Sequence, residues 1–533
     1  MVILTGTVIW LFFAACKNNK APERKIYTRN TGITKQNAYN NLFLDSAALE
    51  HFITQQNLND AAAEAMRSFY YSRNFEFAWF ARYSVAEQGR EFWNLASYNT
   101  TTLKDTVAYY KALNKKMPDI TAEDTVWASA KDTGFVKTEL MLTDAFIRNI
   151  TQNGSRKVTT QQLGRYLPAE KKDVLDAAAA ELKSSDEVPL NDEAKQAYGQ
   201  LKLELKKYYE AAQKGGWQTI AYTGKRIKKG ETSSIMPAVK YRLKATGEYN
   251  SSDTSTLFDT LLYDAVKKIE KSFGYKADGI ITDSLIKDIN VPARKRVQQL
   301  LVNLNRIKWT PQPAKGRLIT TNIPEYILHV FEDKKKAFDM DVVVGKQSSA
   351  TVVFTGNLTT IVFSPFWNIP PSIIKKEILP KMQDDTGYLT KQNMEIKGYK
   401  NGLPVVRQLP GANNSLGRVK FIFNNSYNIY FHDTPAKDIF NRRKRAYSHG
   451  CIRLSDPVKM AAYLLNFDTS WTKEKITAAM NSPTEIYAPL KHSVPVIITY
   501  YTAWVDEAGI LNFRDDIYGH DAEVAAKIFT NPE

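Results

Sequence analysis

The chain has 533 residues, of which 43% are hydrophobic and 12% aromatic. This length and composition predict two or more folded domains and exclude a wholly disordered chain. The formal net charge of +16 comes from basic residues scattered along the chain, without a zinc-finger, helix-turn-helix or RNA-binding signature. It therefore indicates anionic surroundings and no nucleic-acid partner.

Residues 1–16 form an apolar leader. Its run of apolar residues, 2–15, is too short for a comfortable membrane span and is typical of an export signal. The end of the run, Phe13-Ala14-Ala15-Cys16, resembles a bacterial lipoprotein cleavage box with Cys16 as the acylated residue. Phe13 replaces the usual leucine and no basic residue follows Met1, so a plain signal peptide or an uncleaved anchor stays open. We expect a periplasmic or cell-envelope protein with a lipid anchor in the membrane.

The next regions are a tether and a helical scaffold. Residues 17–36 are polar and basic, which predicts the tether. Residues 37–228 have a helical pattern, and at 198–212 apolar positions recur at helical spacing until Gly215-Gly216 ends the helix. A further amphipathic helix within 291–312 is expected to return to the scaffold.

Residues 229–290 carry an apolar stripe of Phe258, Leu261, Ala265 and Ile269, followed by Phe273-Gly274-Tyr275 and a short helix at 284–289. This arrangement resembles a small peptidoglycan-binding domain of the three-helix kind. Saccharide binding and a purely structural role stay open for it, and we assign it no binding residue.

From residue 317 the hydrophobic pattern changes to period two. It predicts strands at 318–322, 326–331, 337–344 and 351–363 and an antiparallel sheet or sandwich. His329, on one of these strands, is interpreted as a structural residue. A lysine-rich insertion at 373–411 is predicted to be helical, and a hairpin around Glu507-Ala508-Gly509 ends a mostly-β domain over 313–525. The predicted fold class is therefore multidomain α+β.

Cys16 and Cys451 are the two cysteines of the chain. A thiol becomes a good nucleophile when a neighbouring imidazole or cation ionises it. Alternation in residues 419–432 predicts a hairpin that places Tyr430 and His432 on one face. We expect the loop after this hairpin to bring Cys451 back to His432, which would hold the sulfur ionised.

His432 followed by Ser448-His449-Gly450-Cys451-Ile452-Arg453 resembles the signature of the L,D-transpeptidases with a YkuD-type catalytic domain. The segments Pro365-Phe366-Trp367-Asn368-Ile369-Pro370-Pro371-Ser372 and His432-Asp433-Thr434-Pro435 are similar to the large periplasmic, YcbB-like branch of this family. The resemblance implies a cysteine acyltransferase without a cofactor or a metal. It also makes residues 373–411 a lid over the active site, although a passive surface excursion fits nearly as well.

The resemblance makes Cys451 the nucleophile and His432 the base. From the strand phase we add Tyr430 as a donor to the oxyanion. Arg453 either holds the active loop or grips a substrate carboxylate. The other expected site residues are His449 and Gly450 at the oxyanion, Ser448 in support of the loop, and Trp367 and Asn368 in the donor groove or, for the aromatic ring, in the core.

The activity implied is 3→3 crosslinking of peptidoglycan stem peptides through a Cys451 thioester with release of D-alanine, within cell-wall biogenesis and the control of cell shape. Carbapenems are expected to acylate the same thiol, and other cell-wall synthases are possible partners. An L,D-carboxypeptidase that hydrolyses the thioester and a non-catalytic wall-binding lipoprotein are the alternatives. A zinc site of His432, His449 and Cys451 is disfavoured because no paired-cysteine spacing exists, and a serine hydrolase because no Gly-x-Ser-x-Gly elbow is present.

Overall fold

The structure is a computed structural model that describes residues 27–533 except 82, 101–107, 123–125, 154–158, 185–189, 191, 223, 225 and 312–315. The predicted leader with Cys16, and residues 17–26 of the predicted tether, lie outside the described part. Among the described residues, no helix is both long enough and apolar enough to cross a membrane.

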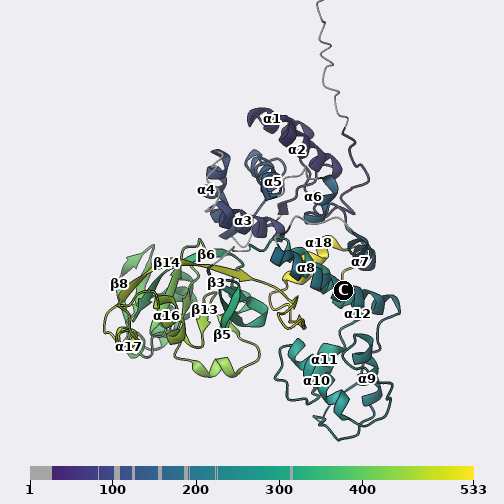
Figure 1. Cartoon of the computed structure of the whole chain (residues 1–533). Helices are drawn as coiled ribbons and strands as arrows, with labels where there is room; N and C mark the ends of the chain where they lie inside the picture. Colours follow the sequence, from purple (N-terminus) through teal and green to yellow (C-terminus); the bar gives the residue numbers. More distant parts are fainter. Residues whose placement is uncertain are drawn as a thin grey trace, which may run out of the picture.

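The N-terminal half is helical (Figure 1). The long helix α5 packs against α1, α2, α3 and α4. A short pair of strands lies between α2 and α3. Just before it, the buried Ala78 and Trp79 donate their backbone N–H groups to Glu139 of α5. The elements are α1 (Ser46–Gln55), α2 (Asp60–Ser72), β1 (Phe80–Ala81), β2 (Ser84–Val85), α3 (Glu87–Thr100), α4 (Ala108–Ala122), α5 (Thr133–Asn153), α6 (Thr160–Tyr166), α7 (Val174–Lys183) and α8 (Asp192–Gln213).

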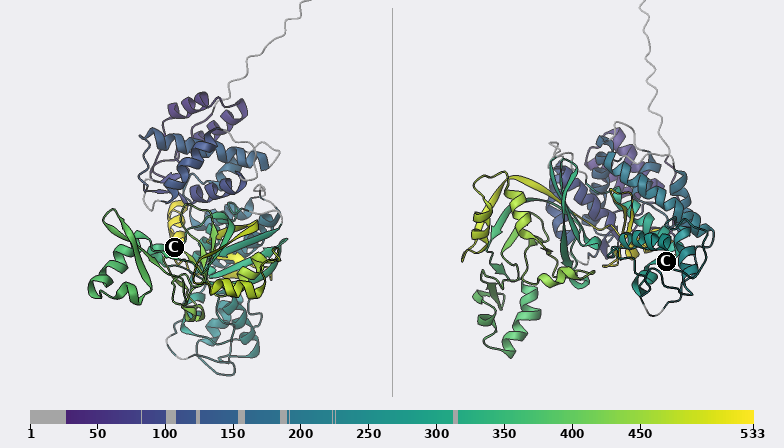
Figure 2. Two further views of the ribbon diagram at one scale, coloured as in Figure 1. Left: turned by 90° about the vertical axis from the view of Figure 1, so that its left-hand side faces the viewer. Right: turned by 60° about the horizontal axis from the view of Figure 1, so that its bottom comes forward.

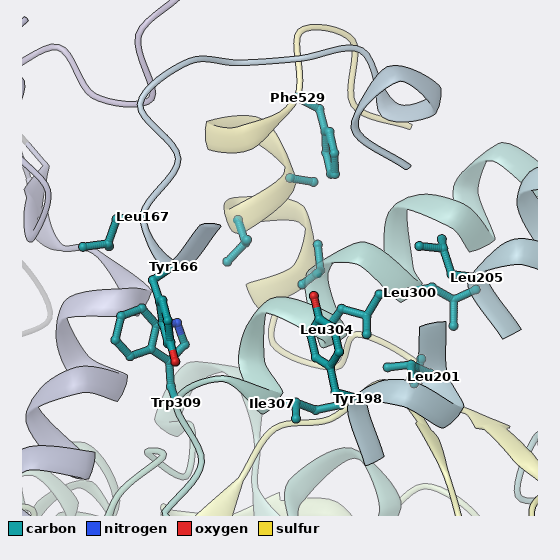
Figure 3. Close-up of a cluster of buried hydrophobic side chains, with 14 of the residues drawn as sticks. Tyr166, Leu167, Tyr198, Leu201, Leu205, Leu300, Leu304, Ile307, Trp309 and Phe529 are labelled. Carbon is teal, nitrogen blue, oxygen red and sulfur yellow. The ribbon is translucent and has the colours of Figure 1, made fainter. Parts of the chain in front are cut away.

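Helix α12 (Ala293–Ile307) lies along α8 and α7, although more than 70 residues separate it from them in sequence. Figure 3 shows the apolar faces of the two long helices meeting, Leu201 and Leu205 of α8 beside Leu300 and Leu304 of α12. The C-terminal helix α18 (His520–Ile528) covers the same cluster with Phe529. The end of the chain is therefore packed into the helical half.

A small helical unit lies between α8 and α12 in the sequence and projects from the helical half (Figure 1). It contains α9 (Met236–Ala245), α10 (Thr260–Ser272) and α11 (Asp283–Ile289). Of the predicted stripe, Phe258, Ala265 and Ile269 are buried, whereas Leu261 is 60% exposed and its neighbour Leu262 is buried instead. The unit contacts the β domain through Arg443, whose guanidinium lies over the ring of Tyr275, and through Ser272, which accepts from Arg514.

The β domain is built on one nine-stranded sheet in the order β12-β5-β13-β11-β10-β6-β14-β3-β4, and β4 also pairs with β5, so that the sheet closes on itself. Most pairs of this sheet are antiparallel, as predicted, but β11–β13, β12–β5 and β14–β3 are parallel, which the sequence did not indicate. The strands are β3 (Arg317–Asn322), β4 (Ile327–Glu332), β5 (Lys335–Gly345), β6 (Thr355–Phe363), β10 (Val419–Phe423), β11 (Phe431–His432), β12 (Ala446–Ser448), β13 (Ile452–Leu454) and β14 (Ile486–Thr499).

Two helices and a hairpin complete this domain. Helix α16 (Pro457–Leu465) and helix α17 (Lys473–Met480) pack onto the apolar core of the sheet. The hairpin of β15 (Ala503–Val505) and β16 (Leu511–Phe513) forms where the sequence predicted it, and it leads the chain back to α12 and α8.

The insertion after β6 is only partly helical, which corrects the sequence prediction. Its first half contains α13 (Pro371–Ile373), a π-helical turn at Ile374–Ile378, α14 (Leu379–Asp384) and α15 (Tyr388–Lys391). Its second half is a hairpin of β8 (Met394–Lys400) and β9 (Leu403–Gln408), which β7 (Trp367–Asn368) extends to three strands. Figure 2 shows this insertion standing away from the sheet, and it has an apolar cluster of its own.

Candidate active site

The candidate site lies on one face of the parallel pair β11–β13. Phe431 is in register with Ile452, and His432 with Arg453. Phe431 and Ile452 are fully buried in the core of the sheet. Because side chains alternate along a strand, Tyr430, His432, Cys451 and Arg453 share the opposite face. The predicted pairing of Tyr430 with His432 is confirmed by the 5.8 Å between their ring centroids.

The Cys451 thiol is partly exposed and lies against Tyr430. The thiol donates to the carbonyl oxygen of Asn428 at 3.7 Å. The backbone and the hydroxyl of Tyr430 lie close enough to the sulfur to act on its pKa. Desolvation raises the pKa of Cys451 to about 11, although Tyr430 and the nearby Arg453 charge both act to lower it. The thiol is therefore protonated in the resting structure.

The His432 ring is buried, with 4% of the residue exposed. Its Nδ1 lies 2.5 Å from the backbone oxygen of Asp433, and a second backbone contact is to Leu416. Burial and then the Arg453 charge lower the pKa of His432 to about 3. Our expectation of a sulfur ionised by this imidazole is therefore wrong for the resting state, in which both groups are neutral. Among the described residues no hydrogen bond joins them, and they share Tyr430 and Arg453 as neighbours.

Asp433 orients the base through its backbone, since its carboxylate is occupied elsewhere. The carboxylate accepts from the N–H groups of Arg418 and Thr434 and from Lys437. Gly417 permits this arrangement: its φ is +63°, and a Cβ there would lie 2.4 Å from Asp433 Cγ. A glycine at this position therefore allows the close approach that holds the His432 ring.

The loop before the thiol is held by its own side chains. Ser448 Oγ donates to the Cys451 carbonyl at 2.5 Å and accepts from the Gly450 N–H at 3.2 Å. Gly450 has a φ of +114°, a conformation that favours glycine. The ring of His449 turns outward, and its Nε2 lies 2.7 Å from Glu377 in the π-helical turn of the insertion. His449 therefore connects the insertion to the cysteine loop, and among the described residues it makes no hydrogen bond to Cys451.

Arg453 and the two predicted groove residues differ in their surroundings. Arg453 is largely buried, and its Nε has no hydrogen-bond partner among the described residues. Trp367 is half-buried and packs against the apolar cluster of the insertion. Asn368 is exposed beside it. The structure thus brings Arg453 into the site, whereas Trp367 and Asn368 belong to the strand that begins the insertion.

Three residues near the site have no place in the sequence prediction. Asn428 offers its carbonyl to the thiol and has a φ of +55°. Glu377 meets His449, and Thr351 bonds to the cysteine loop. Asparagine is enriched in left-handed backbone. Of the three residues, Asn428 is therefore the one whose turn conformation the sequence indicated.

A lone thiol, a buried imidazole and a cation on one face of a mostly-β domain define a candidate cysteine acyltransferase site. Residues 316–498 match the family model of the L,D-transpeptidase catalytic domain (YkuD), and residues 64–205 match that of the Scaffold domain. These two matches bear out the predicted family for their own residue ranges, a YkuD-type L,D-transpeptidase catalytic domain that follows a helical Scaffold domain in the sequence.

The chain is similar to a Haemophilus influenzae protein named "Putative L,D-transpeptidase", with 34% identity over 243 residues. The match covers 43% of this chain and spans about half of that protein, 49%. Solved L,D-transpeptidases from Xylanimonas cellulosilytica and Stackebrandtia nassauensis are 12% and 14% identical, each covering 52% of this chain and 99% and 97% of theirs, with TM-scores of 0.17 and 0.22. Because these TM-scores are low, the family assignment rests on the two family models and not on the solved structures.

Proposed function

We propose that this protein crosslinks peptidoglycan stem peptides by L,D-transpeptidation, with Cys451 as nucleophile and His432 as base. The observation that carries the proposal is the common face of β11 and β13, where a thiol beside Tyr430 shares the neighbour Arg453 with a neutral imidazole. A neutral imidazole accepts a proton, which a charged one does not. The site needs no cofactor for this chemistry.

In the proposed reaction the Cys451 sulfur attacks the carbonyl that precedes the terminal D-residue of a tetrapeptide stem. The thiol proton passes to His432 as the sulfur–carbon bond forms, and the imidazolium returns it to the departing D-alanine amine. The amine of a neighbouring stem then displaces the thioester, giving a 3→3 crosslink and restoring the thiol. Since both groups are neutral at rest, proton transfer accompanies the attack and does not precede it.

The guanidinium of Arg453 is placed to bind the terminal carboxylate of the donor stem peptide. The leaving D-alanine carries a carboxylate two bonds beyond the nitrogen that departs. The buried Nε of Arg453 has no hydrogen-bond partner among the described residues, and such a charged donor is costly unless an anion meets it. The structural contacts that a loop-holding role requires are not seen for Arg453 among the described residues, so we favour donor binding over the loop role.

The setting of the reaction is also a proposal. The apolar leader ending at Cys16 supports export and a lipid anchor in the envelope, which would place the enzyme beside its polymer and other wall synthases. Replacement of Cys16 by serine tests the anchor, because it removes the acylated thiol. Continued incorporation of a labelled fatty acid in that variant contradicts the anchor.

The purified exported chain, incubated with disaccharide-tetrapeptides, is expected to form crosslinked dimers with loss of D-alanine, detected by mass spectrometry. A carbapenem should add to the protein as a covalent mass that the Cys451→Ala variant lacks. The Cys451→Ser variant is a size-matched control and should form no dimer. Shortening to tripeptide without dimers indicates a carboxypeptidase, and unchanged muropeptides indicate a wall-binding protein.

A further inference from the structure

Thr351 lies behind the cysteine loop, in the segment between β5 and β6, and is fully buried. Its Oγ1 donates to the carbonyl of Gly450 at 2.7 Å and accepts from the N–H of Gly345 at 2.9 Å. Its own N–H donates to the Tyr518 hydroxyl, which in turn donates to the Gly345 carbonyl at 2.6 Å. The Thr351 hydroxyl therefore both donates and accepts a hydrogen bond, and its backbone N–H is also bonded.

The bond from Thr351 fixes the direction of one peptide group. The peptide joining Gly450 to Cys451 is trans, as are all described peptides. In a trans peptide the carbonyl and the following N–H point to opposite sides. With the Gly450 oxygen held by Thr351, the N–H of Cys451 points away from this buried network, and it has no acceptor among the described residues.

The following peptide is fixed as well. The Cys451 carbonyl accepts from Ser448, and the Ile452 N–H donates to the Tyr430 carbonyl at 3.2 Å. Cys451 thus stands between two immobilised peptide groups. The Gly450 N–H, which the sequence placed at the oxyanion, is engaged by Ser448 in this structure. The N–H of Cys451, by contrast, has no hydrogen-bond acceptor among the described residues.

We propose that Thr351 is a positioning residue: by holding the Gly450 carbonyl it aims the Cys451 N–H at the oxyanion that forms when the Cys451 sulfur attacks a carbonyl. A donor pre-aligned in this way stabilises the tetrahedral state without reorganisation. The sulfur–carbon bond forms, the carbonyl pair moves onto oxygen, and the Cys451 N–H receives that charge. This inference deepens the proposed function and rests on its nucleophile, but not on the identity of the peptide donor.

The test compares two reactions of the same thiol. Acylation by p-nitrophenyl acetate passes through an oxyanion, whereas alkylation by iodoacetamide does not. Thr351→Val removes the hydroxyl at nearly constant size, and we expect it to slow acylation by roughly 10- to 100-fold, since loss of one such donor costs about 10²–10³-fold. Alkylation should stay within about twofold, because the sulfur and Tyr430 are untouched.

Two further variants make the comparison strict. Thr351→Ser keeps the hydroxyl and should acylate within about threefold of the parent, whereas Thr351→Ala, similar in size to serine, should fall with Thr351→Val. The matched control is Thr321→Val: Thr321 is also fully buried in this domain, but its hydroxyl has no partner among the described residues, so its loss should leave both rates unchanged.

The outcomes separate the inference from the proposed function. Equal acylation by Thr351→Val and the parent, or a parallel loss of alkylation, overturns the role of Thr351. If Thr351→Val does not fold, the alanine and serine pair gives the same decision. A parent protein that reacts with p-nitrophenyl acetate but leaves disaccharide-tetrapeptides unchanged overturns the proposed substrate and leaves the Thr351 comparison valid.

Discussion

Two histidines on the same sheet have opposite surroundings. His329 of β4 lies between two carboxylates, with Nδ1 2.7 Å from Asp339 and Nε2 3.2 Å from Glu325. Burial alone would lower the pKa of His329, but these hydrogen bonds outweigh it and raise the pKa to about 9. His432 of β11 meets backbone oxygens and the Arg453 charge, and its pKa falls to about 3.

This difference separates a structural histidine from a candidate base. An imidazole already charged at neutral pH cannot accept the proton of a thiol, whereas a neutral one can. His329 also lines a cavity of about 560 Å³ beside the scaffold, so exposure to a large cavity does not mark the catalytic histidine. The neighbours of the ring do mark it: among the described residues no carboxylate is hydrogen-bonded to His432, which leaves its ring available to accept a proton.

The largest expected effect is on acylation and comes from replacing each of the two histidines by glutamine. His432→Gln removes the proton acceptor and should slow acylation of Cys451 by a carbapenem by about 10²- to 10⁴-fold. His329→Gln should keep acylation within about twofold and lower the melting temperature instead, because it leaves two carboxylates without their cation. Time-resolved intact-mass spectra and thermal unfolding measure the two effects. Equal loss of acylation in both variants would contradict the assignment.

Sequence alone predicted the face that carries the site, because alternation is local. Tyr430 and His432 are two residues apart on one strand, so their common face follows from the period of a strand. The charge state of Cys451 could not be predicted in this way. It depends on desolvation and on the nearby Tyr430, and both act on the sulfur only after the chain from 433 to 450 has returned to form the parallel pair.

The insertion shows a signal that was present but not used. Asn401-Gly402 has φ of +52° and +77°, as a two-residue hairpin turn requires, and Asn-Gly is the preferred sequence for it. The lysine-rich composition favoured a helix over this turn signal. Thr351 is a different case, since it meets Gly450 from a segment distant in sequence and no local pattern marks it.

A smaller effect is expected from Gly417, which allows Asp433 to hold the His432 ring. Gly417→Ala would place a Cβ 2.4 Å from Asp433 Cγ at a φ of +63°, and we expect a loss of about 2–4 kcal/mol in unfolding free energy. Acylation should slow by about tenfold because the base is no longer oriented. Gly509→Ala is the control: its φ is +74° with open space around it, so it should cost only about 1 kcal/mol and leave acylation unchanged. Denaturant unfolding and acylation rates decide between them.

The smallest effect is a pH dependence of stability with opposite signs at the two rings. The folded pKa of His329, about 9, lies above the unfolded value near 6.5, so its contribution is fully present below about pH 6.5 and is lost as the pH rises through about 9. We expect about 1–3 kcal/mol, since one pKa unit corresponds to about 1.4 kcal/mol. The double variant Glu325→Gln with Asp339→Asn should remove this alkaline loss, measured by urea unfolding near pH 6 and pH 9.5.

At His432 the folded pKa is the lower one, so the unfolded chain binds more protons between about pH 6.5 and 3 and stability falls as the pH drops through this range. His432→Gln should therefore reduce acid sensitivity without changing the alkaline limb, and an alkaline change in that variant would show that the two rings do not act separately.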